Sequence, residues 1–216
     1  MHDLKVWLSY VSYPITTAAY LERALRRVCH TTTIGPTLPH EKAVEWQLEA
    51  LKLPFKDQEI CTGFKPDMGK VLADTDPACH PDLYLWVESV GGHYPQNLAA
   101  LTCTKACYLI DTHMRLADLI EWSHQFDCVF VAQLAHVAAF RKEGINAHWL
   151  PLACDPDIHQ GPVEEKEFDI AFVGSIYKDS RRKHLLDQLN QQGFFRKMHL
   201  PLIRKDQSVQ LISLER

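Results

Sequence analysis

The sequence has no segment that would carry the chain into or through a membrane. No stretch approaches the roughly 18 consecutive apolar residues of a transmembrane helix. The N-terminal residues MHDLKVWLSYV have neither the cationic start nor the small-residue cleavage site of a secretory leader. Because nothing in the sequence directs export, it predicts a cytoplasmic protein without a membrane span.

Neither sign of charge is in large excess. The 216 residues include 23 Lys and Arg against 27 Asp and Glu, which gives a formal net charge of −4. A protein whose main partner is DNA or RNA needs a clustered positive field for the phosphate backbone, and this acidic balance argues against such a partner. It does not exclude a nucleotide as a small-molecule ligand.

The sequence also lacks the spacing of a metal site. Its seven cysteines are odd in number and widely separated, which is typical of reduced, mostly buried thiols. Cys103 and Cys107 are not accompanied by a second Cys or His pair at zinc-ligand spacing, and Cys154 has no histidine at a motif distance. We therefore expect no bound metal, no other cofactor and no thiol catalysis.

Short apolar runs alternate with amphipathic helices along the first 150 residues. Such alternation is typical of a parallel sheet with helices on both faces, so the sequence predicts a Rossmann-like α/β fold. Predicted strands cover Lys5–Val11, His30–Ile34, Asp82–Val87, Ala106–Ile110, Cys128–Val131 and Ala147–Leu150. The first predicted helix begins at Thr16 or Thr17. The other predicted helices cover Glu41–Leu53, Met68–Ala73, Gln96–Leu101, Arg115–His124 and Leu134–Glu143.

The helix after the first strand has apolar residues at spacings of three and four. Ala18, Leu21, Leu25 and Val28 form one face, which we expect to pack on the sheet. The same pattern predicts that Glu22 points away from that face. Thr16 or Thr17 is expected to cap the start of this helix.

The pattern breaks after residue 150 and then restarts. Residues 151–167 contain three prolines and a charged run, which is typical of a connection between domains. A strand over Phe168–Val173, a loop at Gly174 and a helix capped by Ser180 follow, with Leu185, Leu186 and Leu189 directed inward. The sequence therefore predicts an N-terminal Rossmann-like domain over residues 1–150, an interdomain connection over 151–167, and the incomplete start of a second Rossmann-like domain over 168–216.

The restart has features of a phosphate-binding loop. A strand that ends in Gly174 lets a ligand approach the backbone closely, and the next helix offers free N–H groups and a positive dipole end to an anion. Lys178, Arg181, Arg182 and Lys183 add cations beside this helix end, an arrangement that suits a diphosphate. Because the segment is neither G-x-G-x-x-G nor a Walker loop, the alternative remains that Gly174 forms only a tight turn beside solvated cations.

Carboxylates and histidines follow two of the predicted strands. Glu88 and His93 come after one strand, and Asp111 and His113 come after the next. Ligands of open α/β sheets bind at the carboxyl ends of strands. Asp111 and His113 can act as an acid/base pair that takes a proton from an acceptor hydroxyl. The alternative is that Asp111 or Thr112 caps the following helix and His113 is partly solvated.

Four segments, taken in order, resemble one protein family. They are YLIDTH at Tyr108–His113, FDCVFVAQ at Phe126–Gln133, WLPLACDPDIH at Trp149–His159, and FDIAFVGS from Phe168 followed by SRRKHLL. Over about residues 82–193 the chain is similar to the CgeB-like glycosyltransferases, the spore-maturation-protein type of sugar transferase with GT-B architecture. The order of the segments, rather than any single one, supports this resemblance.

The resemblance implies two Rossmann-like domains that face each other across a cleft. The first would offer an unknown acceptor, with Asp111 and His113 as catalytic residues. The second would hold a nucleotide-diphosphate sugar, and no metal would be needed because the helix dipole and cations stabilise the leaving diphosphate. The implied donor and phosphate-binding residues are Gly174, Ser175, Lys178, Arg181 and Arg182.

The chain departs from that family in the length of its second domain. Such enzymes continue for well over a hundred residues there, whereas this sequence ends at Arg216. We therefore expect a chain truncated in its donor half and inactive when isolated. One alternative is a non-catalytic module that binds a glycan or a protein, with self-association through poorly covered residues such as Phe172 and Leu186. Another is a Rossmann-like nucleotide binder unrelated to sugar transfer.

Overall fold

The computed structural model divides the chain into two units. The first unit, called the sheet unit here, comprises Met1–Leu38 and Pro54–His159, and the second unit comprises Pro39–Leu53 and Gln160–Arg216. The chain therefore leaves the sheet unit within the predicted connection. The structure describes residues 3–46, 48–89, 92–159, 168–172, 175–176, 180–192, 197–199, 203–204, 207–209 and 211–215.

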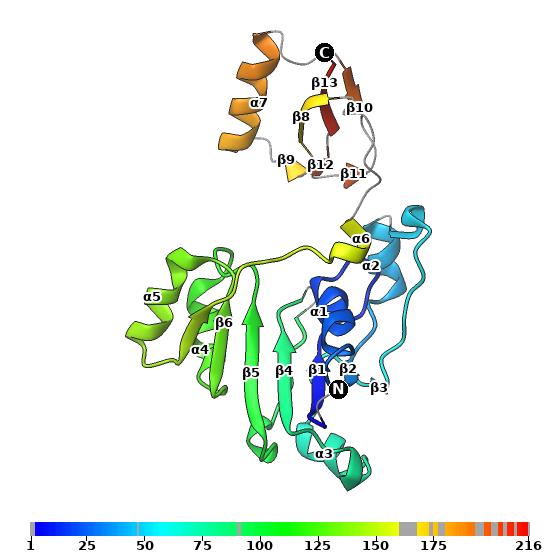
Figure 1. Ribbon diagram of the computed structural model, residues 1–216, viewed down its shortest axis with the longest axis vertical. Coiled ribbons are helices and arrows are strands. Elements are labelled where there is room, and N and C mark those ends of the chain that lie inside the picture. The colour runs from blue at the N-terminus through cyan, green and yellow to red at the C-terminus, as the bar shows by residue number, and fades with distance from the viewer. Residues whose placement is uncertain are drawn as a thin grey trace. The chain divides into compact units, whose positions relative to one another are not determined.

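The sheet unit is built on a seven-stranded sheet whose neighbouring strands all run parallel (Figure 1). The order across the sheet is β3-β2-β1-β4-β5-β6-β7, so the chain winds outward from β1 in one direction and then from β4 in the other. The boundary between β1 and β4 is the topological switch point. The strands are β1 Lys5–Ser9, β2 His30–Gly35, β3 Ile60–Cys61, β4 Leu83–Val87, β5 Thr104–Leu109, β6 Cys128–Val131 and β7 Ala147–Trp149.

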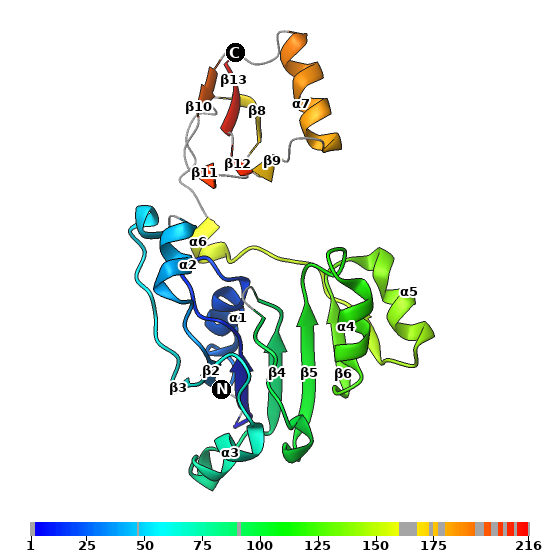
Figure 2. The same cartoon turned by 180° about the vertical axis from the view of Figure 1, so that it is seen from behind.

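Helices cover both faces of this sheet, which confirms the predicted Rossmann-like α/β fold. Strand side chains alternate between two cores, because successive residues of a strand point to opposite faces. One core includes residues of α3, α4 and α5, and α4 and α5 lie beside β6 (Figure 2). The other core includes residues of α1. The helices are α1 Thr17–Leu25, α3 Met68–Ala73, α4 Leu116–Ser123, α5 Leu134–Lys142 and α6 Pro156–His159, with 3-10 turns at Pro77–Cys79 and Leu98–Ala100.

The first helix corrects two sequence expectations. It ends at Leu25, so Val28 does not extend the apolar face and is 50% exposed. Glu22 was expected to point away from the apolar face but is buried. Its carboxylate accepts hydrogen bonds from Tyr10 and Arg26. Thr16 occupies the predicted cap position, yet its side chain makes no capping hydrogen bond.

The second unit contains the predicted strand and helix. The strand is β8, Phe168–Phe172, and the helix is α7, Arg181–Gln191, where the Ser180 hydroxyl accepts a hydrogen bond from the Lys183 N–H at 3.1 Å. Leu185 is 54% exposed rather than inward. In place of one helix over Glu41–Leu53, the chain forms α2 His40–Glu45 and a 3-10 turn at Leu48–Leu51.

The described strands of the second unit pair antiparallel. β8 pairs with β13, Leu211–Glu215, and β13 also pairs with β10, Lys197–His199. β12, Gln207–Val209, pairs with β9, Ser175–Ile176, and with β11, Ile203–Arg204. A Rossmann-like domain pairs its strands in parallel, so these pairings differ from the predicted start of a second such domain. None of the helices in the described ranges has the length and hydropathy needed to cross a membrane.

Candidate functional site

A cavity of about 340 Å³ opens at the carboxyl edge of the sheet unit, and we call it the edge cavity. Its wall comes from the loops that follow β1, β4 and β5, and these three strands are neighbours around the switch point. Open α/β sheets bind ligands at this place, because the loops diverge there and leave a crevice. The edge cavity is therefore the candidate functional site of the sheet unit.

Two side chains fix the loops around the edge cavity. The Glu88 carboxylate accepts hydrogen bonds from the backbone N–H groups of Ile110 at 2.7 Å and Asp111 at 2.9 Å, which ties the end of β5 to the end of β4. The Ser89 hydroxyl accepts one from the Val11 N–H at 3.0 Å and ties the β1 loop to the same strand. Glu88, predicted at this edge from its position after a strand, thus both lines the cavity and holds its wall.

Asp111 and His113 are the predicted acid/base pair. Both residues are exposed, and Asp111 lines the edge cavity. Within the described ranges, their side chains form no hydrogen bond with each other. The alternative that Asp111 or Thr112 caps the next helix is wrong, because Arg115 occupies the cap position of α4. Their proposed roles in catalysis stay a prediction.

A histidine that the sequence analysis did not single out is oriented beside this loop. The buried Thr112 hydroxyl lies 2.7 Å from both Gln133 Oε1 and His136 Nδ1. Gln133 Oε1 can only accept, so Thr112 donates to it, and His136 Nδ1 must donate to the Thr112 oxygen. In this tautomer Nδ1 of His136 carries the hydrogen and Nε2 carries none. The pairing joins residues 24 positions apart, which no local pattern indicates.

His93, the other histidine predicted at the edge, is a structural residue. It is 1% exposed, and its Nδ1 lies 3.2 Å from the Phe64 carbonyl oxygen while its Nε2 lies 2.9 Å from the Ser9 hydroxyl. Because a carbonyl can only accept, Nδ1 carries the hydrogen and Nε2 accepts from Ser9. Burial lowers the pKa of His93 to about 4, so the ring is neutral at pH 7.

Acid is expected to destabilise the sheet unit through His93. Its folded pKa of about 4 lies below the ordinary 6.5, so below pH 6.5 the unfolded chain binds the proton more readily. The stability is complete above pH 6.5 and falls by about 3 kcal/mol as the pH approaches 4. Urea unfolding between pH 7 and 4 measures this slope. We expect His93→Gln to flatten the slope and His124→Gln, at an exposed site, to keep it; equal slopes in both variants would contradict the assignment.

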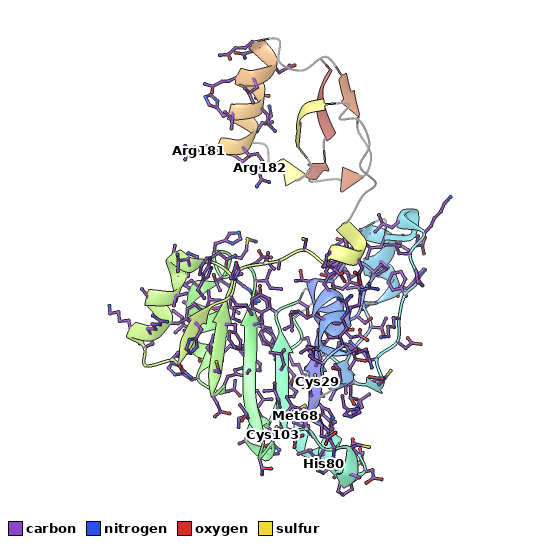
Figure 3. The ribbon with its side chains drawn as sticks, in the orientation of Figure 1. Cys29, Met68, His80, Cys103, Arg181 and Arg182 are labelled. Carbon is purple, nitrogen blue, oxygen red and sulfur yellow. The ribbon has the colours of Figure 1, made fainter. Side chains whose placement is uncertain are left out.

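The predicted donor residues belong to the second unit. Gly174 and Lys178 lie outside the described residues, and Ser175 begins β9. Arg181 and Arg182 form the first turn of α7, where both are exposed (Figure 3). Lys183 in the same turn pairs with Asp187 at 2.6 Å. The predicted diphosphate site therefore has three described cations, Arg181, Arg182 and Lys183, at the start of a capped helix.

Cysteine positions correct one expectation. All seven cysteines are free. Cys29 and Cys107 are buried as predicted, and burial raises the pKa of the Cys107 thiol. Cys61, Cys79 and Cys154 are instead exposed, so the prediction of mostly buried thiols is wrong. Among the residues that the structure describes, no group of three or more His, Cys, Asp or Glu side chains is placed to hold a metal ion.

Comparison with known proteins adds no relative to this geometry. No protein-family model matches the chain. A search of curated proteins finds no significant match. The function proposed below therefore rests on the sequence motifs and on the edge cavity.

Proposed function

We propose that the sheet unit is the acceptor-binding half of a glycosyltransferase that uses a nucleotide-diphosphate sugar. The observation that supports this most is the edge cavity at the switch point, because the predicted base Asp111 lies in its wall. The volume of about 340 Å³ suits a ligand of the size of a monosaccharide. The ordered segments that resemble CgeB-like glycosyltransferases favour the same class of reaction.

In this proposal Asp111 acts on the acceptor. Its carboxylate takes the proton from an acceptor hydroxyl while that oxygen attacks the anomeric carbon of the donor sugar. The backbone of Asp111 is held by Glu88 at 2.9 Å, which keeps the loop in place without using the Asp111 carboxylate. His113, exposed two residues further on, is the second residue proposed to assist proton transfer.

The second unit is proposed to hold the donor. The leaving diphosphate would receive backbone N–H groups and the positive end of the α7 dipole, together with Arg181 and Arg182. Gly174, Ser175 and Lys178 complete the proposed donor site. Such charge stabilisation needs no metal ion.

In a longer form that carries a complete donor half, replacing Asp111 by asparagine is expected to lower sugar transfer at least about 100-fold, because the amide cannot take the proton. The assay measures nucleotide release from UDP- and GDP-sugars with a panel of sugar acceptors. Asp118→Asn is the matched control, since Asp118 is an exposed carboxylate in the first turn of α4. Equal rates for the two variants would remove Asp111 from the mechanism.

Calorimetric titration separates the remaining alternatives. Binding of UDP- or GDP-sugars in preference to NAD supports the donor assignment, whereas preference for NAD would replace it with a Rossmann-like nucleotide binder. Binding of glycans without binding of any nucleotide sugar would instead favour a non-catalytic glycan-binding module. Self-association through the second unit stays a prediction, and light scattering on the same samples reports it.

A further inference from the structure

The start of helix α1 opens into the edge cavity. Thr16 and Thr17 both line it, and α1 is nine residues long. The first N–H groups of a helix have no carbonyl partner within it, and the aligned peptide dipoles give that end a partial positive charge. This end of the cavity therefore presents donors and positive potential to whatever enters it.

Thr16 is the second feature of this end. The residue is only 2% exposed, it lines the cavity, and its side chain does not cap the helix. Within the described part of the chain its hydroxyl has no hydrogen-bond partner. The Thr16 side chain thus faces the cavity, where its hydroxyl can exchange a hydrogen bond with a ligand. The hydroxyl of an N-cap threonine ordinarily accepts a hydrogen bond from a backbone N–H of the helix. The Thr16 hydroxyl makes no such bond, so it is available to a ligand.

Arg115 adds a full positive charge to the same cavity. Its guanidinium donates a hydrogen bond to the Tyr94 hydroxyl and lies over the Tyr94 ring, with 5.6 Å between the central carbon and the ring centroid. This double contact orients the planar group and uses only part of its donors. The fork of an arginine suits the paired oxygens of a phosphate or carboxylate.

Two carboxylates in the wall of the edge cavity limit which molecules can carry the anionic group. Glu88 already accepts two backbone N–H groups through Oε2, which offsets part of its charge. Asp111 is exposed and can accept hydrogen bonds from hydroxyl groups of a ligand. A ligand that satisfies both ends has an anionic group near α1 and Arg115 and hydroxyls near Asp111.

We propose that the edge cavity binds an anionic sugar, with its phosphate or carboxylate against Thr16, the start of α1 and Arg115. If this ligand is the acceptor, the inference rests on the proposed function, because the sugar then places one of its hydroxyl groups beside Asp111. Binding of an anionic sugar, whatever its role, is inferred only from the residues that line the edge cavity. No donor residue of the second unit takes part in it.

Calorimetry on the full chain tests the site with glucose 6-phosphate, glucuronate, inorganic phosphate and glucose. We expect both anionic sugars to bind, glucose to bind at least about tenfold more weakly, and added salt to weaken only the anions. Inorganic phosphate reports the anion contacts alone, and the two sugars distinguish a phosphate from a carboxylate as the preferred group.

Substitutions at Thr16 and Arg115 locate the anion. Thr16→Val keeps the shape and removes the hydroxyl, and we expect it to weaken glucose 6-phosphate binding about tenfold while the melting temperature is unchanged or higher. Thr16→Ser should restore binding. Arg115→Gln is expected to weaken binding at least about tenfold, and Lys142→Gln, an exposed cation on α5, should leave it unchanged.

Each outcome decides between the two proposals. Glucose 6-phosphate that binds no better than glucose, or that binds Thr16→Val as tightly as the wild type, overturns the anionic site. Transfer of sugar to a neutral acceptor without anion binding would leave the proposed function standing and remove this inference. Anion binding that depends on Thr16 and Arg115, together with no transfer by a longer form that carries a complete donor half, would support this inference and remove the proposed function.

Discussion

Replacing Gly35 by alanine is expected to destabilise the sheet unit by about 4 kcal/mol or more, a large part of the stability of an ordinary domain. Gly35 ends β2 with a φ of 144°, a region that residues with a side chain rarely adopt. A Cβ built there would lie far inside van der Waals contact with the Tyr10 carbonyl oxygen, which is backbone and cannot rotate away.

The two segments cannot separate to make room for the extra carbon. The backbone beyond β1 is bonded to the backbone of residues 34–38 on both sides of the contact: the Tyr10 N–H donates to Ile34 at 3.1 Å, and the Ser12 N–H donates to Pro36 at 2.9 Å. The Tyr10 carbonyl also accepts a hydrogen bond from the Gln58 side chain at 2.9 Å. Moving either segment would break these bonds, so the strain has no inexpensive relief.

Chemical denaturation of the two glycine variants measures this effect. Gly63→Ala is the control, because a Cβ there meets no atom within 4 Å and its φ is not in the positive range. We expect that variant to unfold within about 0.5 kcal/mol of the wild type. If the unfolding free energy of Gly35→Ala is also within about 0.5 kcal/mol of the wild type, the backbone yields at the Tyr10 contact.

Two short elements were predicted with the bounds that the structure has. The helix Met68–Ala73 was predicted with the bounds that the structure has, and Asp67 caps it by accepting from the Gly69 and Lys70 N–H groups at 2.8 and 3.3 Å. The strand Cys128–Val131 was also predicted with its observed bounds. The strand is an unbroken apolar run, whereas the helix was placed as one short helix within an irregular segment rich in Gly and Pro.

The site was predictable only in outline. Open α/β sheets bind ligands at the carboxyl ends of their strands, and this rule predicted Asp111 as a site residue. Thr16 and Arg115 were missed as site residues because each has an ordinary local interpretation, one as a helix cap and the other as a helix start. His136 was missed because its orientation depends on Thr112, a contact between two loops. Such meetings are set by the three-dimensional arrangement of loops, which a single sequence does not specify.

The burial of Glu22 shows the same limit for charge. A carboxylate among arginines on a helix reads as solvent-exposed, yet its side chain is 5% exposed. Tyr10 donates to it at 2.9 Å, Arg26 donates at 2.7 Å, and Lys56 also donates to it. Lys56 is 34 positions further along the chain, so the helix sequence alone cannot show that the charge has partners.

Replacing Glu22 by alanine is accordingly expected to cost about 3 to 5 kcal/mol, because the Tyr10 hydroxyl and two cations lose a buried partner. Burial alone would raise the pKa of Glu22, but the hydrogen bonds from Lys56, Arg26 and Tyr10 outweigh it and hold the pKa below its usual value. The stabilisation is therefore present above about pH 4.5 and is lost as the pH falls through the folded pKa.

Asp157 provides the matched control, since it also pairs with two arginines, Arg23 and Arg27, but is 55% exposed. We expect Asp157→Ala to cost no more than about 1 kcal/mol, because solvent screens an exposed ion pair and rehydrates the groups left behind. Urea unfolding at pH 7 compares the two variants directly. If both lose the same small amount, water reaches the Tyr10–Glu22 cluster in the folded protein. A large loss confined to Glu22→Ala would instead show that this buried carboxylate joins α1 to the end of β1, the same strand end whose following loop forms one wall of the edge cavity.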